Sequence, residues 1–241
     1  MKTISLYNLG LQPYKQVWEF QEQLFNETVA AKLHNRDNPA DLVEVKSNLI
    51  LCQHPHVYTL GNSGSADNLL LDDNGLDEVH AEFHKVNRGG DMTYHGPGQL
   101  VGYPIFDLDV FFTDIHKFLR HIEKAIIELL AYYGLQGDVI EGLTGVWLDK
   151  GIPGKERKIC AVGVRCSRWV TMHGFALNVN TDLNYFGHII ACGIRDKGVT
   201  SLQQELGREV DMNEVETLLL TQLKAVFEID FQLVEAKITA I

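Results

Sequence analysis

Cys192 is the cysteine whose neighbours best suit a reactive thiol. It stands between Ala191 and Gly193, whose small side chains leave room for a substrate, and Arg195 and Lys197 follow it closely. Nearby positive charge stabilises the thiolate, which is the nucleophilic form of cysteine. These features make Cys192 a candidate nucleophile. A loop cysteine without a catalytic role is the alternative that the pattern alone leaves open.

The other three cysteines lie in stretches typical of buried strands. Cys52 follows an apolar run, and Cys160 and Cys166 alternate with valines in 157–166, so all three are expected in the core. Lys158 opens the same stretch. A partly desolvated lysine has a lowered pKa and can exchange a proton with a thiol or an amine. Because Cys160 is two residues away, roughly 7 Å along a strand, we expect Lys158 to act on a partner distant in sequence.

The segment "RGGDMTYHGPGQ", residues 88–99, suits neither a helix nor a strand, because it contains four glycines and a proline. Glycine permits backbone conformations and close approaches that other residues do not. Arg88 could meet an anion beside exposed backbone N–H groups. We interpret the segment as a backbone wall along a ligand, with a long turn as the alternative. Tyr94, His95 and His173 are further candidates that could instead simply pack against turns.

Several common site motifs are missing or incomplete in the sequence. The glycine segment is not a G-x-G-x-x-G fingerprint within a strand–turn–helix unit. Residues 151–157 lack the spacing and the Ser or Thr of a phosphate-binding P-loop. His54 and His56 would share one face of a strand, but spacing offers no third metal ligand, so we predict structural histidines and no metal site. No G-x-S-x-G marks a serine hydrolase.

The 241 residues carry a net charge of −11 and no apolar run that could span a membrane. Such an acidic balance argues against nucleic-acid binding, and the N-terminal residues lack a secretory pattern, so we expect one cytoplasmic domain over 1–241. The charge is uneven, because residues 155–168 contain five basic residues and one acid. This basic stretch, with Arg195 and Lys197, is either a solvated strand edge or a docking patch for an acidic partner.

Helices and strands must position these candidate residues. Apolar residues at helical spacing predict helices over 13–34, 114–133 and 211–228. Asp114 and Asp211 are placed to cap the second and third. Stretches rich in β-branched and aromatic residues predict strands over 4–10, 42–53, 56–61, 82–88, 99–108, 145–150, 157–166 and 173–180. Groups of strands separated by long helices predict an α/β (α+β) fold, a mixed β-sheet flanked by helices.

Five segments, taken together, resemble one known family, the lipoyl(octanoyl) transferases, also called lipoate-protein ligase B. "RGGDMTYHGPGQLVGYPI" at 88–105 looks like the family signature. The other blocks follow the family's order and are "HPHVYTLG" at 54–61, "RKICAVGVR" at 157–165, "HGFALNVN" at 173–180 and "ACGI" at 191–194. The resemblance spans roughly residues 1–210, and the combination is far more specific than any single block.

The resemblance implies a fold shared with biotin and lipoate protein ligases, and a reaction that moves an octanoyl group from octanoyl-acyl carrier protein to a lysine of apo lipoyl domains. The acceptors would be the E2 subunits of 2-oxoacid dehydrogenases and the glycine cleavage H protein. No cofactor is implied, since one thioester is exchanged for another. Cys192 matches the family's nucleophile and Lys158 the lysine that tunes it. The matching acyl-binding positions are Arg88, Gly89, Gly90, Asp91, Met92, Thr93, Tyr94, His95, Ala161, Val162, Gly163, Gly174, Phe175 and Ala176.

Two positions depart from the family pattern, and two other functions stay open. Ala191 stands where proline usually precedes the cysteine, and His56 stands where a second proline is common. An ATP-dependent lipoate or biotin ligase would use Lys158 but would not need Cys192. A non-catalytic module that binds acyl groups or carrier proteins would need neither residue for chemistry.

Overall fold

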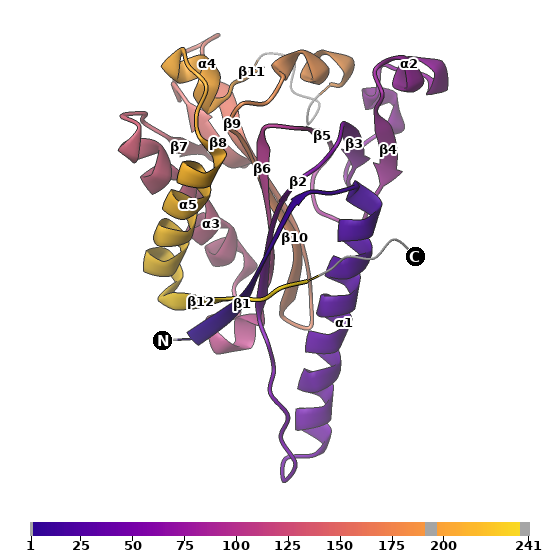
Figure 1. Ribbon diagram of the computed structural model, residues 1–241, viewed down its shortest axis with the longest axis vertical. Helices are drawn as coiled ribbons and strands as arrows, with labels where there is room; N and C mark the ends of the chain where they lie inside the picture. The colour runs from indigo at the N-terminus through magenta and orange to yellow at the C-terminus, as the bar shows by residue number, and fades with distance from the viewer. Residues whose placement is uncertain (1, 191–196, 237–241) are drawn as a thin grey trace.

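The computed structural model describes residues 2–190 and 197–236, and a nine-stranded mixed sheet forms its centre (Figure 1). The strand order is β12-β1-β2-β6-β10-β9-β8-β7, and β11 pairs with β9. Strands β12, β1 and β2 are parallel to one another, whereas β2, β6, β10, β9, β8 and β7 pair antiparallel. The bounds are β1 (Lys2–Leu11), β2 (Asn48–Gln53), β6 (Gln99–Ile105), β7 (Asp138–Ile140), β8 (Leu143–Leu148), β9 (Arg157–Ser167), β10 (Val170–Asn178), β11 (Gly198–Val199) and β12 (Ile229–Leu233). The expectation of a mixed sheet flanked by helices is confirmed.

Helices cover both faces of this sheet. Figure 1 shows α3 (Ile115–Tyr132) and α5 (Met212–Phe227) on one side and α1 (Tyr14–Asp37) on the other. Alternation along β2 explains the three layers, because successive strand residues point to opposite faces. Leu49 and Leu51 join the core beneath α3 and α5, while Ile50 and Cys52 join the core beneath α1. Each such leucine, fully buried, contributes about 2 kcal/mol.

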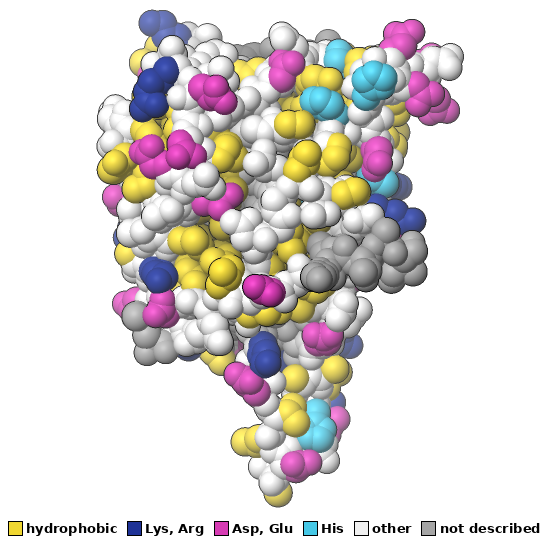
Figure 2. All heavy atoms as spheres, viewed as in Figure 1, with side chains coloured by type: hydrophobic (Ala, Val, Ile, Leu, Met, Phe, Trp, Pro, Cys, Tyr) yellow, Lys and Arg dark blue, Asp and Glu magenta, His cyan; other side chains and the backbone are white. Residues whose placement is uncertain are grey.

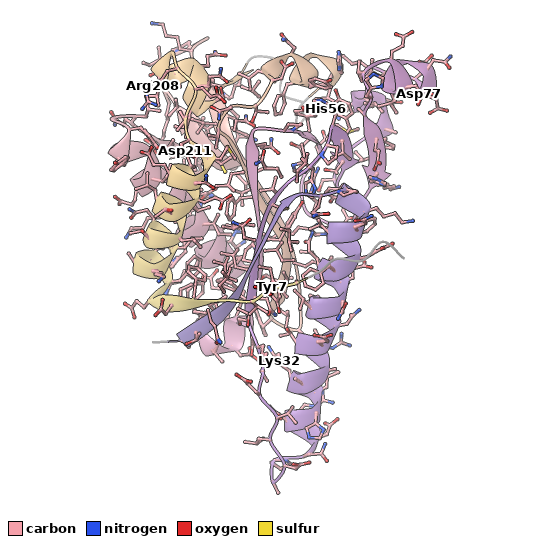
Figure 3. All side chains as sticks on the ribbon, viewed as in Figure 1. Tyr7, Lys32, His56, Asp77, Arg208 and Asp211 are labelled. Atoms are coloured by element: carbon pink, nitrogen blue, oxygen red, sulfur yellow. The ribbon has the colours of Figure 1, made fainter. Side chains whose placement is uncertain are left out.

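A second, smaller sheet has the order β4-β3-β5. Its strands are β3 (Val57–Leu60), β4 (Glu82–Lys85) and β5 (Met92–His95), with β3 parallel to β4 and antiparallel to β5. In Figure 3, His56, which directly precedes β3, lies at the end of the molecule that holds the small sheet. Lys32 lies on the part of α1 that is far from the small sheet. The shorter elements are α2 (Asp73–Glu78), α4 (Leu202–Leu206), η1 (Ala66–Asn68), η2 (Leu108–Val110) and η3 (Leu183–His188).

The predicted helix starts are confirmed by their caps. The carboxylate of Asp114 accepts a hydrogen bond from the backbone N–H of Lys117, and Asp211 accepts one from Asn213.

None of the helices within the described ranges is both long and apolar enough to cross a bilayer.

The observed strands differ from the predicted ones in several places, of which one wrongly predicted strand and one missed strand are explained by their surroundings. Residues 42–47, expected to form strand, run irregularly before β2, because they lie beside the end of α1 and Leu42 is 68% exposed. The side chain of Asn35 exchanges two hydrogen bonds of 2.8 Å with the backbone of Val43 in place of a strand partner. Conversely, residues 92–95 of the glycine segment form strand β5, because β3 supplies the backbone partners that composition cannot reveal.

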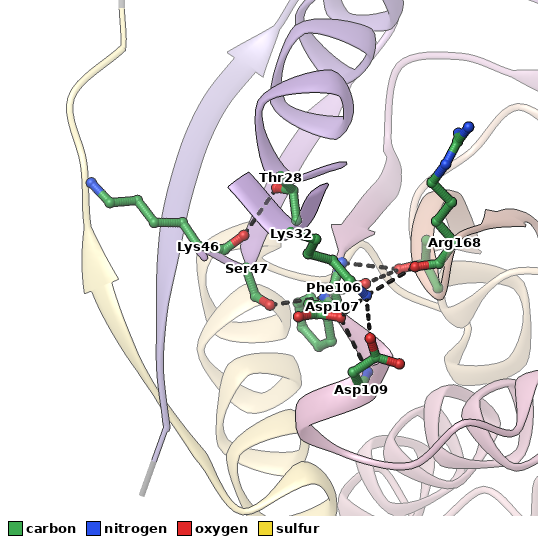
Figure 4. Close-up of polar contacts among 9 residues, drawn as sticks. Thr28, Lys32, Lys46, Ser47, Phe106, Asp107, Asp109 and Arg168 are labelled. Atoms are coloured by element: carbon green, nitrogen blue, oxygen red, sulfur yellow. Dashed lines mark hydrogen bonds and ion pairs between the residues drawn. The ribbon is translucent and has the colours of Figure 1, made fainter. Parts of the chain in front are cut away.

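A polar cluster ties α1 to the main sheet at the end farthest from the small sheet (Figure 4). Lys32 forms ion pairs with Asp107 and Asp109 and donates a hydrogen bond of 2.9 Å to the carbonyl of Arg168. The hydroxyl of Ser47 accepts a hydrogen bond of 3.0 Å from the backbone N–H of Asp107. This cluster fixes the helix against the turn that joins β9 and β10.

Candidate active site

A cavity opens between the small sheet and the neighbouring end of the main sheet. It encloses about 980 Å³, counting its open mouth. One wall is the segment 88–93 with His95, and the other comes from β9 and β10. The predicted positions that line it are Lys158, Arg88, Gly89, Gly90, Asp91, Met92, Thr93, His95, Ala161, Val162, Gly163, Gly174, Phe175 and Ala176. Segments far apart in the sequence therefore converge on one volume.

Tyr94 is the predicted position that does not line the cavity. Its side chain is fully buried on the other face of β5, with its ring centroid 5.0 Å from that of Tyr185 and 5.5 Å from that of Tyr58. Its hydroxyl lies 2.7 Å from Nδ1 of His56. Because β5 is a strand, Tyr94 must point away from the side that its neighbours Thr93 and His95 present to the cavity. Tyr94 supports the wall from behind.

Glycines allow the wall to lie directly against β9. The backbone N–H of Gly89 donates a hydrogen bond of 3.0 Å to the carbonyl of Val164. A Cβ at Gly163 would lie 2.8 Å from the carbonyl oxygen of Gly89, which is closer than real Cβ contacts. Gly90 has a φ of +89°, a conformation that side chains oppose. The glycines are therefore required by a close approach and by one left-handed backbone position.

Arg88 fastens this segment to the small sheet. Its guanidinium donates hydrogen bonds to the carbonyl and the hydroxyl of Thr59, at 2.7 Å and 3.0 Å, and to the carbonyl of Gly89 at 3.0 Å. The side chain is buried, and these acceptors replace the water it has lost. Arg88 thus braces the wall of the cavity as well as lining it.

Lys158 lies on the cavity where β9 begins. Its Nζ is 4.7 Å from the ring centroid of Trp147, which is a cation–π contact. The buried carboxyl of Glu123 is nearby. Burial raises the pKa of this carboxyl, although a hydrogen bond from the backbone N–H of Gly145 and the positive charges of Arg120 and Lys158 act against the rise.

The surroundings of the three described cysteines disfavour the thiolate. Cys52 and Cys160 are buried, and burial raises the pKa of each thiol well above its ordinary value. The prediction that they belong to the core is therefore confirmed. Cys166, which is partly buried, also has a raised pKa for the same reason. Cys192, together with Ala191 and the rest of 191–196, lies outside the described residues, so its role stays a prediction.

The described residues on either side of that segment reach the cavity. Phe186, within η3, and Lys197, just before β11, both line it. Ile189 pairs with Leu69 in an isolated bridge, and the backbone N–H of Ile190 donates a hydrogen bond of 2.8 Å to the carbonyl of Asn68. Described residues that precede and follow the segment 191–196, Phe186 and Lys197, therefore both lie at the cavity.

Three buried histidines near the cavity stay uncharged at neutral pH. Burial lowers the pKa of His54 to about 4 and the pKa of both His95 and His173 to about 3. His54 lies 2.8 Å from both the hydroxyl of Tyr103 and the carbonyl of Gln12, so it is a satisfied structural histidine as predicted. Within the described part of the chain, no group of three or more His, Cys, Asp or Glu residues could hold a metal ion.

Arg195 of the predicted docking patch lies outside the described residues, and the basic side chains of the patch that the structure does describe are not gathered on one surface. Arg157 forms ion pairs with Asp149 and Glu205, and Lys197 forms one with Glu156, so carboxylates offset their charge. Arg168 stands at the other end of β9, which is eleven residues long and therefore spans roughly 33 Å. On the face drawn in Figure 2, acidic and basic side chains are likewise interspersed.

Sequence reasoning missed several residues of the cavity, which are Tyr14, Gln99, Tyr103, Thr144, Trp147, Asn178, Phe186, Gly198 and Val199. Gln99 is the last residue of the glycine segment and could have been suspected from that position. Tyr14, at the start of α1, carries no local signal, because only the packing of α1 against the sheet brings it to the cavity.

Comparisons with known proteins agree with this geometry. The family model described as the lipoyl protein ligase A/B catalytic domain matches residues 13–224. An octanoyltransferase from Cytophaga hutchinsonii is 56% identical over 96% of this chain and 95% of its own length. One from Flavobacterium johnsoniae is 58% identical over 94% of this chain and 97% of its own.

Among solved structures, a bi-partite lipoate protein ligase from Thermoplasma acidophilum is similar, with a TM-score of 0.71. The similarity covers 98% of this chain and 88% of that one at 18% identity. At so low an identity the likeness shows the fold alone. It confirms the expectation of a lipoate ligase-like fold.

Proposed function

Since the chain belongs to the lipoyl protein ligase A/B catalytic family, we propose that it transfers an octanoyl group from octanoyl-acyl carrier protein to a specific lysine of apo lipoyl domains, with Cys192 carrying the group as a thioester. Its octanoyltransferase relatives make it an acyltransferase of protein lipoylation. The carrier-protein donor, the Cys192 thioester and the choice of lysine belong to the proposal.

The observation that carries the proposal is the cavity itself. The three segments expected to bind an acyl chain, 88–95, 161–163 and 174–176, contribute to it, together with Lys158. Burying the methylenes of an eight-carbon chain in such a cavity contributes on the order of 5 kcal/mol to binding. Phe175 and Val162 offer the apolar surface that this requires.

The proposed reaction has two steps, each a substitution at the octanoyl carbonyl. The thiolate of Cys192 attacks the donor thioester, the bond to the carrier sulfur breaks, and the carrier leaves as a thiolate that takes up a proton. The amine of the acceptor lysine then attacks the thioester of Cys192, forming the amide and releasing the Cys192 thiolate. Lys158, positive in the first step, stabilises negative charge and gives its proton to the departing carrier thiolate; neutral after that, it takes the proton of the attacking amine in the second step.

Intact-mass spectrometry tests the intermediate. Incubation with octanoyl-acyl carrier protein, without ATP, should add one octanoyl unit to the chain, and hydroxylamine should remove it. The Cys192→Ala variant should remain unmodified, whereas Cys160→Ala, matched in chemistry but buried, should load normally. An adduct that persists in Cys192→Ala would refute the assignment.

The ATP-dependent ligase is supported only by the shared fold. Its test is a parallel incubation with free octanoate and ATP, in which an adenylate-dependent ligase modifies a lipoyl domain and the proposed enzyme does not. As acceptors we propose lipoyl domains of 2-oxoacid dehydrogenase E2 subunits and the glycine cleavage H protein, and as the compartment the cytoplasm. Mass analysis of each acceptor after incubation with the loaded enzyme tests the first of these.

A further inference from the structure

A continuous chain of buried hydrogen bonds runs beside the cavity from His95 to β9. Nδ1 of His95 lies 2.8 Å from Oε1 of Gln99, and Nε2 of Gln99 donates to Oδ1 of Asn178 at 2.9 Å. Nδ2 of Asn178 donates to the carbonyl of Thr200 at 2.9 Å. The backbone N–H of Thr200 then donates to the carbonyl of Lys158, also at 2.9 Å. The side chains of Gln99, Asn178 and Thr200 are all buried.

Two backbone carbonyls fix the direction of every hydrogen bond in this chain. A carbonyl can only accept, so the group of Asn178 that faces Thr200 must be the NH₂, and its oxygen must face Gln99. Gln99 also faces the carbonyl of Tyr94 at 3.2 Å, so its NH₂ donates to both Tyr94 and Asn178. The oxygen of Gln99 is therefore the atom that meets His95.

This direction determines the tautomer of His95. Because the oxygen of Gln99 only accepts, Nδ1 of His95 must carry the proton, and in a neutral ring Nε2 then holds a lone pair. Within the described residues, Nε2 has no hydrogen-bond partner. Since His95 lines the cavity, Nε2 is an acceptor available to a ligand.

The acceptor lies at the reactive end of the cavity. Gln99 on β6 is paired with Asn178 on β10, and the preceding residue of β10, Leu177, is paired with Cys160 on β9. Two strand spacings therefore separate Gln99 from the region of Lys158, roughly 10 Å. On the proposed function, the cavity-lining ring of His95 is therefore in the same part of the cavity as Lys158, one of the residues assigned to the reaction.

We propose that Gln99 is a positioning residue that holds His95 as its Nδ1–H tautomer, and that Nε2 of His95 accepts a hydrogen bond from an N–H donor of the substrate. An octanoyl chain has no such donor. The attacking lysine amine and the amides of the carrier's phosphopantetheine arm do. This role rests on the proposed function, but the tautomer does not.

Nitrogen-15 NMR of histidine-labelled protein measures the tautomer directly. The chain has ten histidines, and loss of a signal in His95→Asn assigns the one of interest. Burial lowers the pKa of His95; His54, Arg88 and His173 lower it further, and together they outweigh the hydrogen bond with Gln99, which raises it. The signal should therefore show protonated Nδ1 and bare Nε2 from about pH 8 to about pH 5. A wild-type Nε2–H tautomer, or an ordinary titration, would overturn the proposal.

Two substitutions of Gln99 change the ring in different ways. Gln99→Glu places a carboxylate beside Nδ1, which favours the imidazolium, so both nitrogens should be protonated at neutral pH. Gln99→Met removes the acceptor without adding charge, so the Nε2–H form should appear. Gln203→Glu makes the same change as the first on the exposed surface of α4 and should leave the His95 signal unaltered.

The two half-reactions identify the donor. If it is the lysine amine, Gln99→Met slows transfer to a lipoyl domain by about tenfold, the effect of one lost hydrogen bond, and leaves loading unchanged. If it is a pantetheine amide, loading slows instead. Rates of both steps equal to those of Gln203→Glu would overturn the ligand role. Absence of loading in the wild type would refute the proposed function, while the tautomer would still be measured.

Discussion

Replacing Gly163 with alanine should push the glycine segment off β9. The new Cβ would stand 2.8 Å from the carbonyl oxygen of Gly89, and ordinary contact begins at 3.4 Å, so the two must separate by 3.4 − 2.8 = 0.6 Å. The same movement lengthens the 3.0 Å hydrogen bond between Gly89 and Val164 beyond a useful distance. Losing it costs about 1 kcal/mol and the overpacking adds about 1 kcal/mol or more, so we expect the free energy of unfolding to fall by about 2 kcal/mol.

Two assays together test this expectation. Urea denaturation measures the loss of stability, and intact mass measures octanoyl loading, which should require a higher donor concentration because the cavity wall has moved. Gly187→Ala is the matched control, since a Cβ there meets nothing within 4 Å and the backbone is not left-handed. If Gly163→Ala equals this control in both stability and loading, the close approach of the wall to β9 is not a constraint.

Three further predictions concern other parts of the chain. Gly90→Val should abolish octanoyl loading while the protein stays folded by circular dichroism, because φ is +89° at a residue of the wall; normal loading would contradict this. Lys32→Met leaves the buried carboxylate of Asp107 without its ion-pair partner, so the free energy of unfolding, measured in urea, should fall by about 3 kcal/mol. The loading rate of the folded protein should stay unchanged. Burial lowers the pKa of His54 and His95 below 6.5, so the unfolded chain binds more protons below that pH. Stability should therefore fall from pH 6.5 to about pH 5, by up to about 1.4 kcal/mol per pH unit for each histidine, and a flat profile of urea midpoints would refute it.

The sequence pattern predicted the elements whose structure depends mainly on neighbouring residues in the chain. The helix at 115–132 is amphipathic and begins with an aspartate cap, so its bounds followed from periodicity and capping alone. Strand β5 could not be found this way, because its pairing with β3 joins residues more than thirty positions apart. The short strand β12 was missed for the same reason, since its partner is β1 at the other end of the chain.

The residues of the candidate site fall into the same two groups, those that the sequence pattern identified and those that only the packing of the fold brings together. Motif resemblance located the wall, which is one continuous segment, and Lys158, which lies within another of the family's blocks. It did not locate Tyr14 or Trp147, which reach the cavity through packing. Charge was the least predictable property. Residues 155–168 are rich in basic residues in the sequence. In the structure, Arg157 pairs with Asp149 and Glu205, and Arg168 lies beyond the opposite end of β9.

The glycine segment combines two kinds of backbone, and this explains why its composition misleads. Arg88 to Gly90 make no strand and are held by hydrogen bonds to Thr59 and Val164. Residues 92–95 form a strand with two faces, one towards the cavity and one towards the aromatic rings around Tyr94. The wall is therefore anchored by both sheets at once. Moving Arg88 to Gly90 would break contacts to both sheets, so this part of the wall resists displacement by a ligand.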